Sequence, residues 1–179
     1  MISINDIPKF TSWGNYSVHI EWAYLAKQLA DYAEDNVQLD PDFQRGHVWS
    51  TEQQAAYIEF CLKGGKSGRD ILFNNPNWIH SRNDSYNDFV LVDGLQRITA
   101  VTKFINNELA VFGGNLLQDF TGSIGDIRRQ VLRGQRFTVY INDLHSKKEV
   151  LQWYLDLNSG GVVHSQEELN RVREMLKET

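Results

Sequence analysis

The segment from Phe89 to Ile105, "FVLVDGLQRITAVTKFI", constrains the fold of this chain more than any other. Residues 89–92 form an apolar run of strand length, and Asp93-Gly94 follow it as a turn. From Leu95 onward, the apolar residues recur at helical spacing. A buried strand that leads through a glycine turn into a helix is a recurrent anion site, because free backbone N–H groups and the helix dipole both favour negative charge.

Arg97 is the unexpected residue of this segment. A cation in the first turn of a helix faces the positive end of the dipole, which costs up to about 1 kcal/mol. Paired hydrogen bonds to phosphate oxygens would offset that cost, and Gly94 would let a phosphate approach the backbone. Asp93 would then orient a metal-bound water or a ribose hydroxyl. The plainer interpretation is a capping box between Asp93 and Gln96, with Arg97 extending to solvent. Both interpretations remain open at this point.

Composition places the chain among ordinary globular proteins. Its 179 residues are 41% hydrophobic and 23% charged, which predicts a single domain over residues 1–179. The net charge of -5 argues against a strongly basic nucleic-acid-binding protein. No apolar run approaches the roughly 18 residues that a membrane helix needs, and no signal-peptide pattern is present. A single cysteine, Cys61, excludes an internal disulfide and favours the cytoplasm.

Helices and short strands are mixed along the chain. A small polar residue with Glu or Gln three positions later predicts four helix starts, at Ser50/Gln53, Asp93/Gln96, Ser146/Glu149 and Ser165/Glu168. An amphipathic pattern predicts another helix over 20–34. Expected strands are 37–40, 70–74, 89–92, 109–112 and 136–141, and the polar stretch 75–88 is expected to be an exposed loop or a hairpin tip. Strands that do not alternate strictly with helices predict an α+β domain with a mainly helical final third.

Two further stretches carry residues suited to ligand binding. In "PDFQRGHVW", residues 41–49, Gln44 and Arg45 lie in a glycine-containing loop just before a helix. Arg45 is therefore a second candidate for a phosphate contact, or for an ion pair with a carboxylate. In "LNSGGVVHSQEEL", residues 157–169, Asn158 and Gly160-Gly161 end one helix. Such a connector lines a pocket in some proteins and simply ends a helix in others.

Other chemistries have little support in the sequence. The five histidines are scattered without metal-ligand spacing, so no metal site is predicted. The stretch "GGKSG", residues 64–68, lacks the upstream glycine of a phosphate-binding P-loop. The basic cluster "RRQVLRGQR", residues 128–136, suits either a nucleic-acid contact or a solvated helix face, and the solvated face is favoured.

Taken together, "PDFQRGHVW", "LVDGLQRITAV" and "LNSGGVVHSQEEL" resemble, in this order, the hallmark segments of the ParB-like domain at the N-terminus of GmrSD-type restriction enzymes. The resemblance spans about residues 37–173. It implies a ParB/sulfiredoxin-like α+β core of short mixed strands followed by helices. It also implies that the family's DGQQR motif binds and hydrolyses a nucleoside triphosphate, with Mg²⁺ as a candidate companion ion. In the family this activity is linked to nicking or restriction of modified foreign DNA.

The resemblance also assigns roles to residues that match the motifs. Asp93, Gln96 and Arg97 would be catalytic. The nucleotide and its phosphates would be bound by Gln44, Arg45, Gly94, Thr99, Asn158, Gly160 and Gly161. The expected partners are the nucleotide, DNA and a separate effector chain, with no membrane partner. GmrSD-type enzymes carry a C-terminal HNH-like nuclease domain, which we do not expect in residues 1–179. Nuclease activity would then belong to this domain or to a partner chain.

Leu95 departs from the family's motif, because it stands in place of one of the two glutamines and removes a polar group from the site. Neither position 95 nor 96 carries the cysteine of the sulfiredoxin branch, which excludes peroxiredoxin repair. Three functions therefore remain open: an NTP-hydrolysing enzyme linked to DNA cleavage, a non-catalytic nucleotide-gated binding module, and a small-molecule phosphotransferase.

Overall fold

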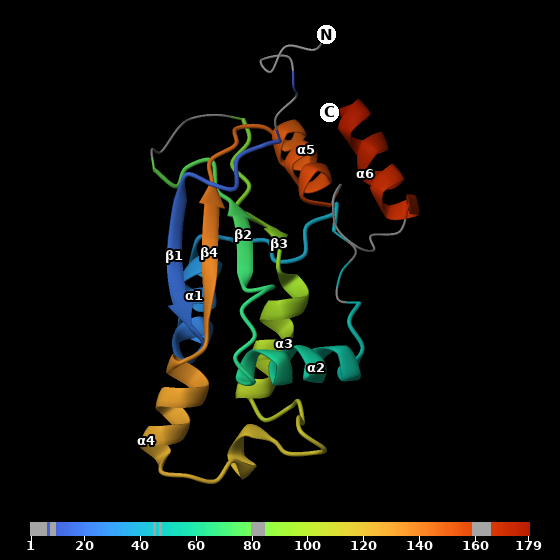
Figure 1. Cartoon of the computed structure of the whole chain (residues 1–179). Helices are drawn as coiled ribbons and strands as arrows, with labels where there is room; N and C mark the ends of the chain where they lie inside the picture. The colour runs from blue at the N-terminus through green and yellow to red at the C-terminus, as the bar shows by residue number, and fades with distance from the viewer. Residues whose placement is uncertain (1–6, 8–9, 45, 47, 80–84, 159–165) are drawn as a thin grey trace.

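A four-stranded mixed sheet forms the centre of the computed structural model, which describes residues 7, 10–44, 46, 48–79, 85–158 and 166–179 (Figure 1). The strands lie in the order β1 (Tyr16–Glu21), β4 (Arg136–Asn142), β2 (Asp70–Asn74) and β3 (Val90–Asp93). β1 pairs with β4 and β2 with β3 in antiparallel fashion, whereas β2 and β4 run parallel. The two central strands therefore come from distant parts of the chain.

One face of the sheet carries the larger core. The helices α1 (Leu25–Glu34), α2 (Thr51–Leu62) and α3 (Leu95–Ile105) pack their apolar residues on alternate residues of the strands. Phe137 of β4, Trp22 of the short 3-10 helix η2 (Trp22–Tyr24) and Phe104 of α3 illustrate this packing, since each is almost fully buried. Each such side chain contributes roughly 1.5–3 kcal/mol on burial. This face fixes where α3 begins, and therefore where residues 93–97 lie.

The opposite face is covered only in part. The helix α5 (Lys147–Asn158) packs on the β3 side of the sheet, where Val92 and Trp153 belong to a second apolar cluster. The helix α6 (Gln166–Glu178) packs on α5, and Arg171 of α6 donates hydrogen bonds to the carbonyl oxygens of Phe43 and Gln44. Figure 1 shows both helices on the β3 side, away from β1.

Three short helical elements complete the described fold: η3 (Leu117–Asp119), α4 (Ile124–Ile127) and the π-helix η4 (Arg128–Arg133). The last of these carries most of the basic cluster noted in the sequence. None of the described helices combines the length and the apolar composition that a membrane-spanning segment requires.

The α+β prediction is confirmed, with β2, β3 and β4 within one residue of the expected bounds. Two predicted strands are wrong, because 37–40 and 109–112 contribute only isolated bridges, Gln38 with Val90 and Val111 with Asn115. The sequence reasoning also missed β1, which it assigned in part to the following helix. Only Val18 and Ile20 of β1 face the core, and its pairing partner β4 lies far along the chain. The helix α1 consequently begins at Leu25 rather than at residue 20.

The predicted helix starts have mixed outcomes. Ser50 and Gln53 form the expected capping box. Ser146 accepts a hydrogen bond from the Glu149 N–H, while the Glu149 carboxylate accepts one from the N–H of His145. The Ser165/Glu168 prediction involves position 165, which lies outside the described residues. The Asp93/Gln96 capping box is wrong, for a reason that the site itself makes clear.

Candidate functional site

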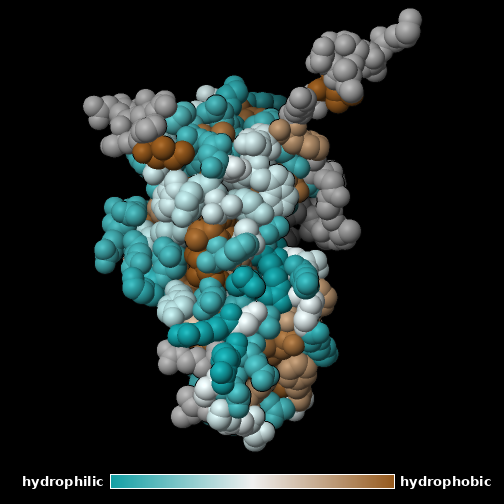
Figure 2. All heavy atoms as spheres, turned by 60° about the vertical axis from the view of Figure 1, so that its left-hand side comes forward, coloured by the Kyte–Doolittle hydropathy of each residue, from teal (hydrophilic) through white to brown (hydrophobic). Residues whose placement is uncertain are grey.

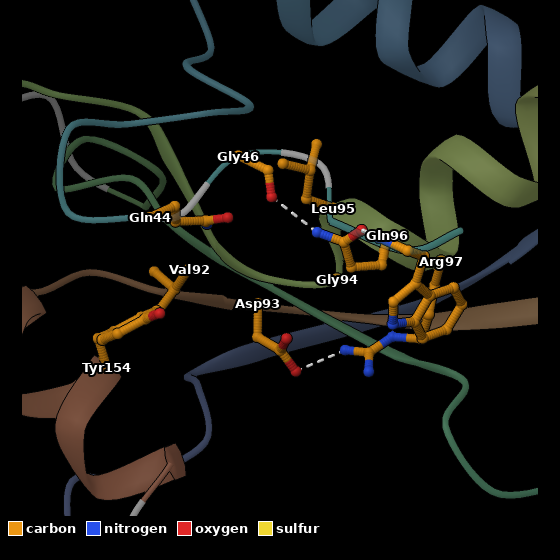
Figure 3. Close-up of a pocket in the computed structure, with 10 residues that line it drawn as sticks. Gln44, Gly46, Val92, Asp93, Gly94, Leu95, Gln96, Arg97 and Tyr154 are labelled. Carbon is orange, nitrogen blue, oxygen red and sulfur yellow. Dashed lines mark hydrogen bonds and ion pairs between the residues drawn. The ribbon is translucent and has the colours of Figure 1, made fainter. Parts of the chain in front are cut away.

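A pocket of about 220 Å³ opens where β3 ends and α3 begins (Figure 3). Three parts of the chain meet there: the loop before α2, the β3–α3 turn and one residue of α5. The lining residues are Gln44, Gly46, Trp49, Val92, Asp93, Gly94, Leu95, Gln96, Arg97 and Tyr154. Two of the three stretches singled out in the sequence are thus brought together, although they lie far apart along the chain.

A β-bulge and a glycine shape the turn at the floor of this pocket. Leu72 pairs with Asp93 and Phe73 pairs with Leu91, so Val92 is an extra residue in β3. Such bulges redirect the side chain that follows them, here Asp93. Gly94 has φ +123°, and a Cβ there would lie 2.6 Å from Ile71 Cδ1. Only glycine therefore fits this position without moving the core.

The N-terminus of α3 is open toward the pocket. Its N-cap is Gly94, and no side chain caps the helix. The first intrahelical hydrogen bond runs from the Ile98 N–H to the Gly94 carbonyl, at 3.0 Å. The N–H groups of residues 95–97 precede this bond and point out of the helix end, which favours an anion there.

Arg97 meets Asp93. Arg97 Nη2 lies 2.5 Å from Asp93 Oδ2, and the side chains are 18% and 47% exposed respectively. This ion pair offsets the poor position of a cation at a helix N-terminus. Among the described residues, the buried Nε of Arg97 has no hydrogen-bond partner. The guanidinium is thus held in place while part of its donor capacity is unused.

Gln96 holds the loop before α2. Its Oε1 accepts hydrogen bonds from the N–H groups of Val48 and Trp49, both at 3.0 Å, and its Nε2 donates to the Gly46 carbonyl at 2.8 Å. Figure 3 shows the last of these contacts. The capping box fails because Gln96 satisfies this distant backbone, while Asp93 turns to Arg97. Gln96 acts first as a positioning residue for the pocket wall.

Gln44 also supports the pocket wall. Its Nε2 donates to the Leu91 carbonyl at 2.5 Å, which ties the loop to β3. Leu95, the departure from the family motif, lines the pocket and also packs against the larger core. The predicted site residues Gln44, Asp93, Gly94, Gln96 and Arg97 all line the pocket.

Two predicted site residues lie behind the pocket lining. Thr99 Oγ1 donates to the Leu95 carbonyl within α3, at 2.8 Å. Asn158, the last residue of α5, donates through Nδ2 to the carbonyl of the pocket residue Tyr154, at 2.6 Å. The remaining predictions, Arg45, Gly160 and Gly161, lie outside the described residues.

Asp70 is an acidic neighbour that the sequence reasoning missed. Burial raises the pKa of its carboxyl group, while nearby Arg97 lowers that pKa and nearby Asp93 raises it. Asp70 begins β2 and is brought near the pair only by the register of β2 on β3. No local pattern in "RDILFN" could have shown this. In the described part of the chain, no group of three or more His, Cys, Asp or Glu residues could hold a metal ion.

The donor set suits a phosphate group better than a bare metal ion. The uncapped helix end and the partly bonded Arg97 offer hydrogen-bond donors, and Asp93 offers a single carboxylate. Mg²⁺ commonly uses one or two carboxylates together with substrate phosphates, so it would fit here with a bound triphosphate.

The chain matches one known protein family. The family is described as GmrSD restriction endonuclease, N-terminal domain, and the match covers residues 27–173. All the residues that line the pocket fall within that span. No curated protein and no solved structure matches the chain.

Proposed function

This chain belongs to the GmrSD restriction endonuclease N-terminal domain family, and we propose that its pocket binds the phosphates of a nucleoside triphosphate in a restriction function. The observation that carries the proposal is the open N-terminus of α3 beside a partly bonded Arg97. Helix N-termini and arginine side chains are both common phosphate-binding elements in proteins.

The volume of the pocket favours the phosphate end of the ligand. Ligand pockets typically enclose about 300–1,000 Å³. The 220 Å³ here is smaller, so the phosphates would occupy the pocket and the nucleoside would extend from its mouth. Mg²⁺ would join the phosphates to Asp93, as it does in many phosphoryl-transfer sites.

Phosphate binding would change the partner of Arg97. A phosphate at the helix N-terminus competes with Asp93 for the guanidinium, since both are anions that accept charge-assisted hydrogen bonds. Asp93 would then be released to orient a water molecule or Mg²⁺. In this way one binding event would prepare the carboxylate for hydrolysis, with Arg97 stabilising negative charge on the phosphate.

A non-catalytic, nucleotide-gated binding module is a second candidate, favoured by the contacts of Gln96. Both ends of this amide are engaged by backbone groups of Gly46, Val48 and Trp49. Gln96 would therefore have to leave that loop before it could orient water. A nucleotide that only orders the loop before α2 would need no such change. The ordered loop would then bind DNA or an effector chain more tightly when nucleotide is in the pocket.

The decisive experiment is calorimetric titration with each nucleoside triphosphate, with and without Mg²⁺. Arg97→Ala should weaken binding about tenfold or more, because hydrogen bonds to charged groups contribute roughly 1.5–3 kcal/mol. Arg97→Lys keeps the charge without the forked geometry and should fall between wild type and Arg97→Ala. Arg129→Ala is the matched control, since Arg129 is 74% exposed and lies outside the pocket.

Phosphate release measured on the same samples separates the two candidates. Turnover that Asp93→Asn abolishes while nucleotide still binds would support the enzyme. Binding without turnover would support the module. If no nucleotide binds, or if Arg97→Ala binds as tightly as Arg129→Ala, the proposal is wrong.

A further inference from the structure

The half of the sheet face that α5 and α6 leave open is a second surface with distinct chemistry. Alternation along β4 places Arg136, Thr138 and Tyr140 on this face, opposite the larger core. His19 of β1 lies directly across from Thr138, and its Nδ1 is 3.2 Å from the Thr138 Oγ1. Figure 2 views the molecule from the β1 side and shows teal and pale side chains around a smaller brown patch near the middle.

A groove of about 420 Å³ lies at the end of this face where β4 begins. Its walls include the cations Lys66, Arg69 and Arg136, together with His19 and the carboxylate of Asp70. We call this surface the basic groove. Ion pairs among the described residues involve none of the three cations. Glu21 lies across from Arg136 in the strand register, so the groove keeps two acidic neighbours and a small excess of positive charge.

Arg69 is the fixed centre of the basic groove. Its Nε and Nη2 donate to the Gly65 carbonyl at 2.9 and 2.6 Å, and Nη2 also reaches the Cys61 carbonyl and Gln135 Oε1. All these acceptors are neutral, so they hold the guanidinium in place without cancelling its charge. Lys66 and Arg136 are exposed and can adjust to a ligand around it.

Aromatic side chains lie at the other end of the same face. Trp13 is 50% exposed, and its ring meets that of Tyr140 edge to face, with centroids 5.5 Å apart. Tyr140 lies four residues beyond Arg136 along β4, a distance of roughly 13 Å at the usual rise of a strand. One continuous face thus joins cations to an exposed aromatic ring.

We propose that this face binds single-stranded nucleic acid, with backbone phosphates in the basic groove and a base stacked on Trp13. Cations that follow the backbone and aromatic rings that stack on bases are the two parts of a single-strand binding site. A duplex satisfies the cations equally well, but its paired bases are already stacked and leave the exposed ring without a partner. The proposal depends on the proposed restriction function only in the choice of DNA as the polymer.

Fluorescence anisotropy with a labelled 15-nucleotide single strand and the corresponding duplex tests this directly, on the full chain without nucleotide. The double variant Lys66→Ala/Arg136→Ala should weaken binding and lower the slope of log affinity against log salt by about 1.4, since each phosphate contact to a single strand contributes about 0.7. Lys27→Ala/Lys177→Ala removes the same charge from exposed positions outside the groove and should leave both quantities near wild type.

Trp13 tests the aromatic part of the proposal. Trp13→Ala should weaken single-strand binding about fivefold or more, and Trp13→Tyr should restore most of it because a ring remains to stack on a base. Thermal melting of each variant shows whether it is folded. Equal binding by the two double variants, tighter binding of the duplex, or an equal loss in Trp13→Ala and Trp13→Tyr would overturn the proposal. Arg97 does not line the groove, so Arg97→Ala should keep most of the single-strand binding while nucleotide binding is lost. Failure of one site is then distinguishable from failure of the other.

Discussion

The pocket at the start of α3 and the basic groove both present cations to an anion, yet they are built in opposite ways. In the pocket, Arg97 is paired with a carboxylate only four residues earlier. In the groove, the three cations have no carboxylate partner among the described residues, and Arg69 is held by neutral oxygens. A paired cation is partly neutralised by its partner, whereas an unpaired cation attracts anions with its full charge.

This difference has functional consequences. In the proposed phosphate site, exchange of partners would make the pocket selective, because an anion would have to compete with Asp93 in charge and geometry for Arg97 Nη2. The groove should attract any polyanion, and its affinity should fall steeply with salt because its charges are exposed. If both proposals hold, the pocket would bind a specific small ligand and the groove a polymer.

Gly94→Ala should have the largest effect, because it alters the pocket and leaves the groove intact. Its positive φ alone costs about 1–3 kcal/mol for a residue with a side chain, and the contact with Ile71 adds about 1–3 kcal/mol of overpacking. We expect the free energy of unfolding, measured in urea, to fall by about 3 kcal/mol or more.

The matched control is Gly113→Ala, where φ is +81° and an added Cβ would meet nothing within 4 Å. It should show the backbone cost alone. At temperatures where Gly94→Ala is still folded, nucleotide binding should be lost and DNA binding kept. Equal destabilisation by the two substitutions would show that the contact with Ile71 is easily relieved.

Gln96→Ala should have the next largest effect. It removes three hydrogen bonds to the backbone of the loop before α2 and should lower the free energy of unfolding by about 1–3 kcal/mol. Gln96→Glu keeps the acceptor for Val48 and Trp49 but loses the donor to Gly46, so its loss should be smaller. Urea unfolding measures the loss of stability, and nucleotide titration measures any loss of binding. A Gln96→Ala protein that loses turnover with unchanged stability would instead indicate a purely catalytic role.

Substitution of Asp70 should have the smallest effect on stability. This residue links the two sites, because it lines the groove and its pKa, which burial raises, is also shifted by Arg97 and Asp93 of the pocket. Burial raises its pKa above the ordinary 3.8, so the folded protein binds this proton more tightly than the unfolded chain. The free energy of unfolding should therefore fall as pH rises from 3.8 through the folded-state pKa.

Asp70→Asn removes this contribution. The variant should match wild type in acid and be slightly more stable above that window, as measured by urea midpoints between pH 3 and pH 8. Asp35→Asn, at an exposed position after α1, is the control. A variant that is less stable than wild type at pH 7 would show that the charged Asp70 stabilises the fold through Arg97.

Sequence reasoning succeeded where the determining contacts are local. The strand, the glycine turn and α3 follow from residues 89–105 because apolar period and turn chemistry act over a few residues. It failed for β1, whose polar edge pattern becomes a strand only against β4. It also failed for the Asp93/Gln96 capping box, because a backbone far along the chain offered Gln96 better partners.

An α+β domain, the strand, turn and helix of residues 89–105, and five of the residues that line the pocket could be predicted from the sequence alone. Tertiary packing was needed to pair Arg97 with Asp93 and to bring Asp70 beside both sites. It also places Gln96 on the backbone of Gly46, Val48 and Trp49. The basic groove also depends on tertiary structure. Lys66 and Arg136 lie far apart in the sequence and line one groove only because β2 pairs in parallel with β4. Local patterns encode conformation over a few residues, whereas strand order and register decide which distant charges become neighbours.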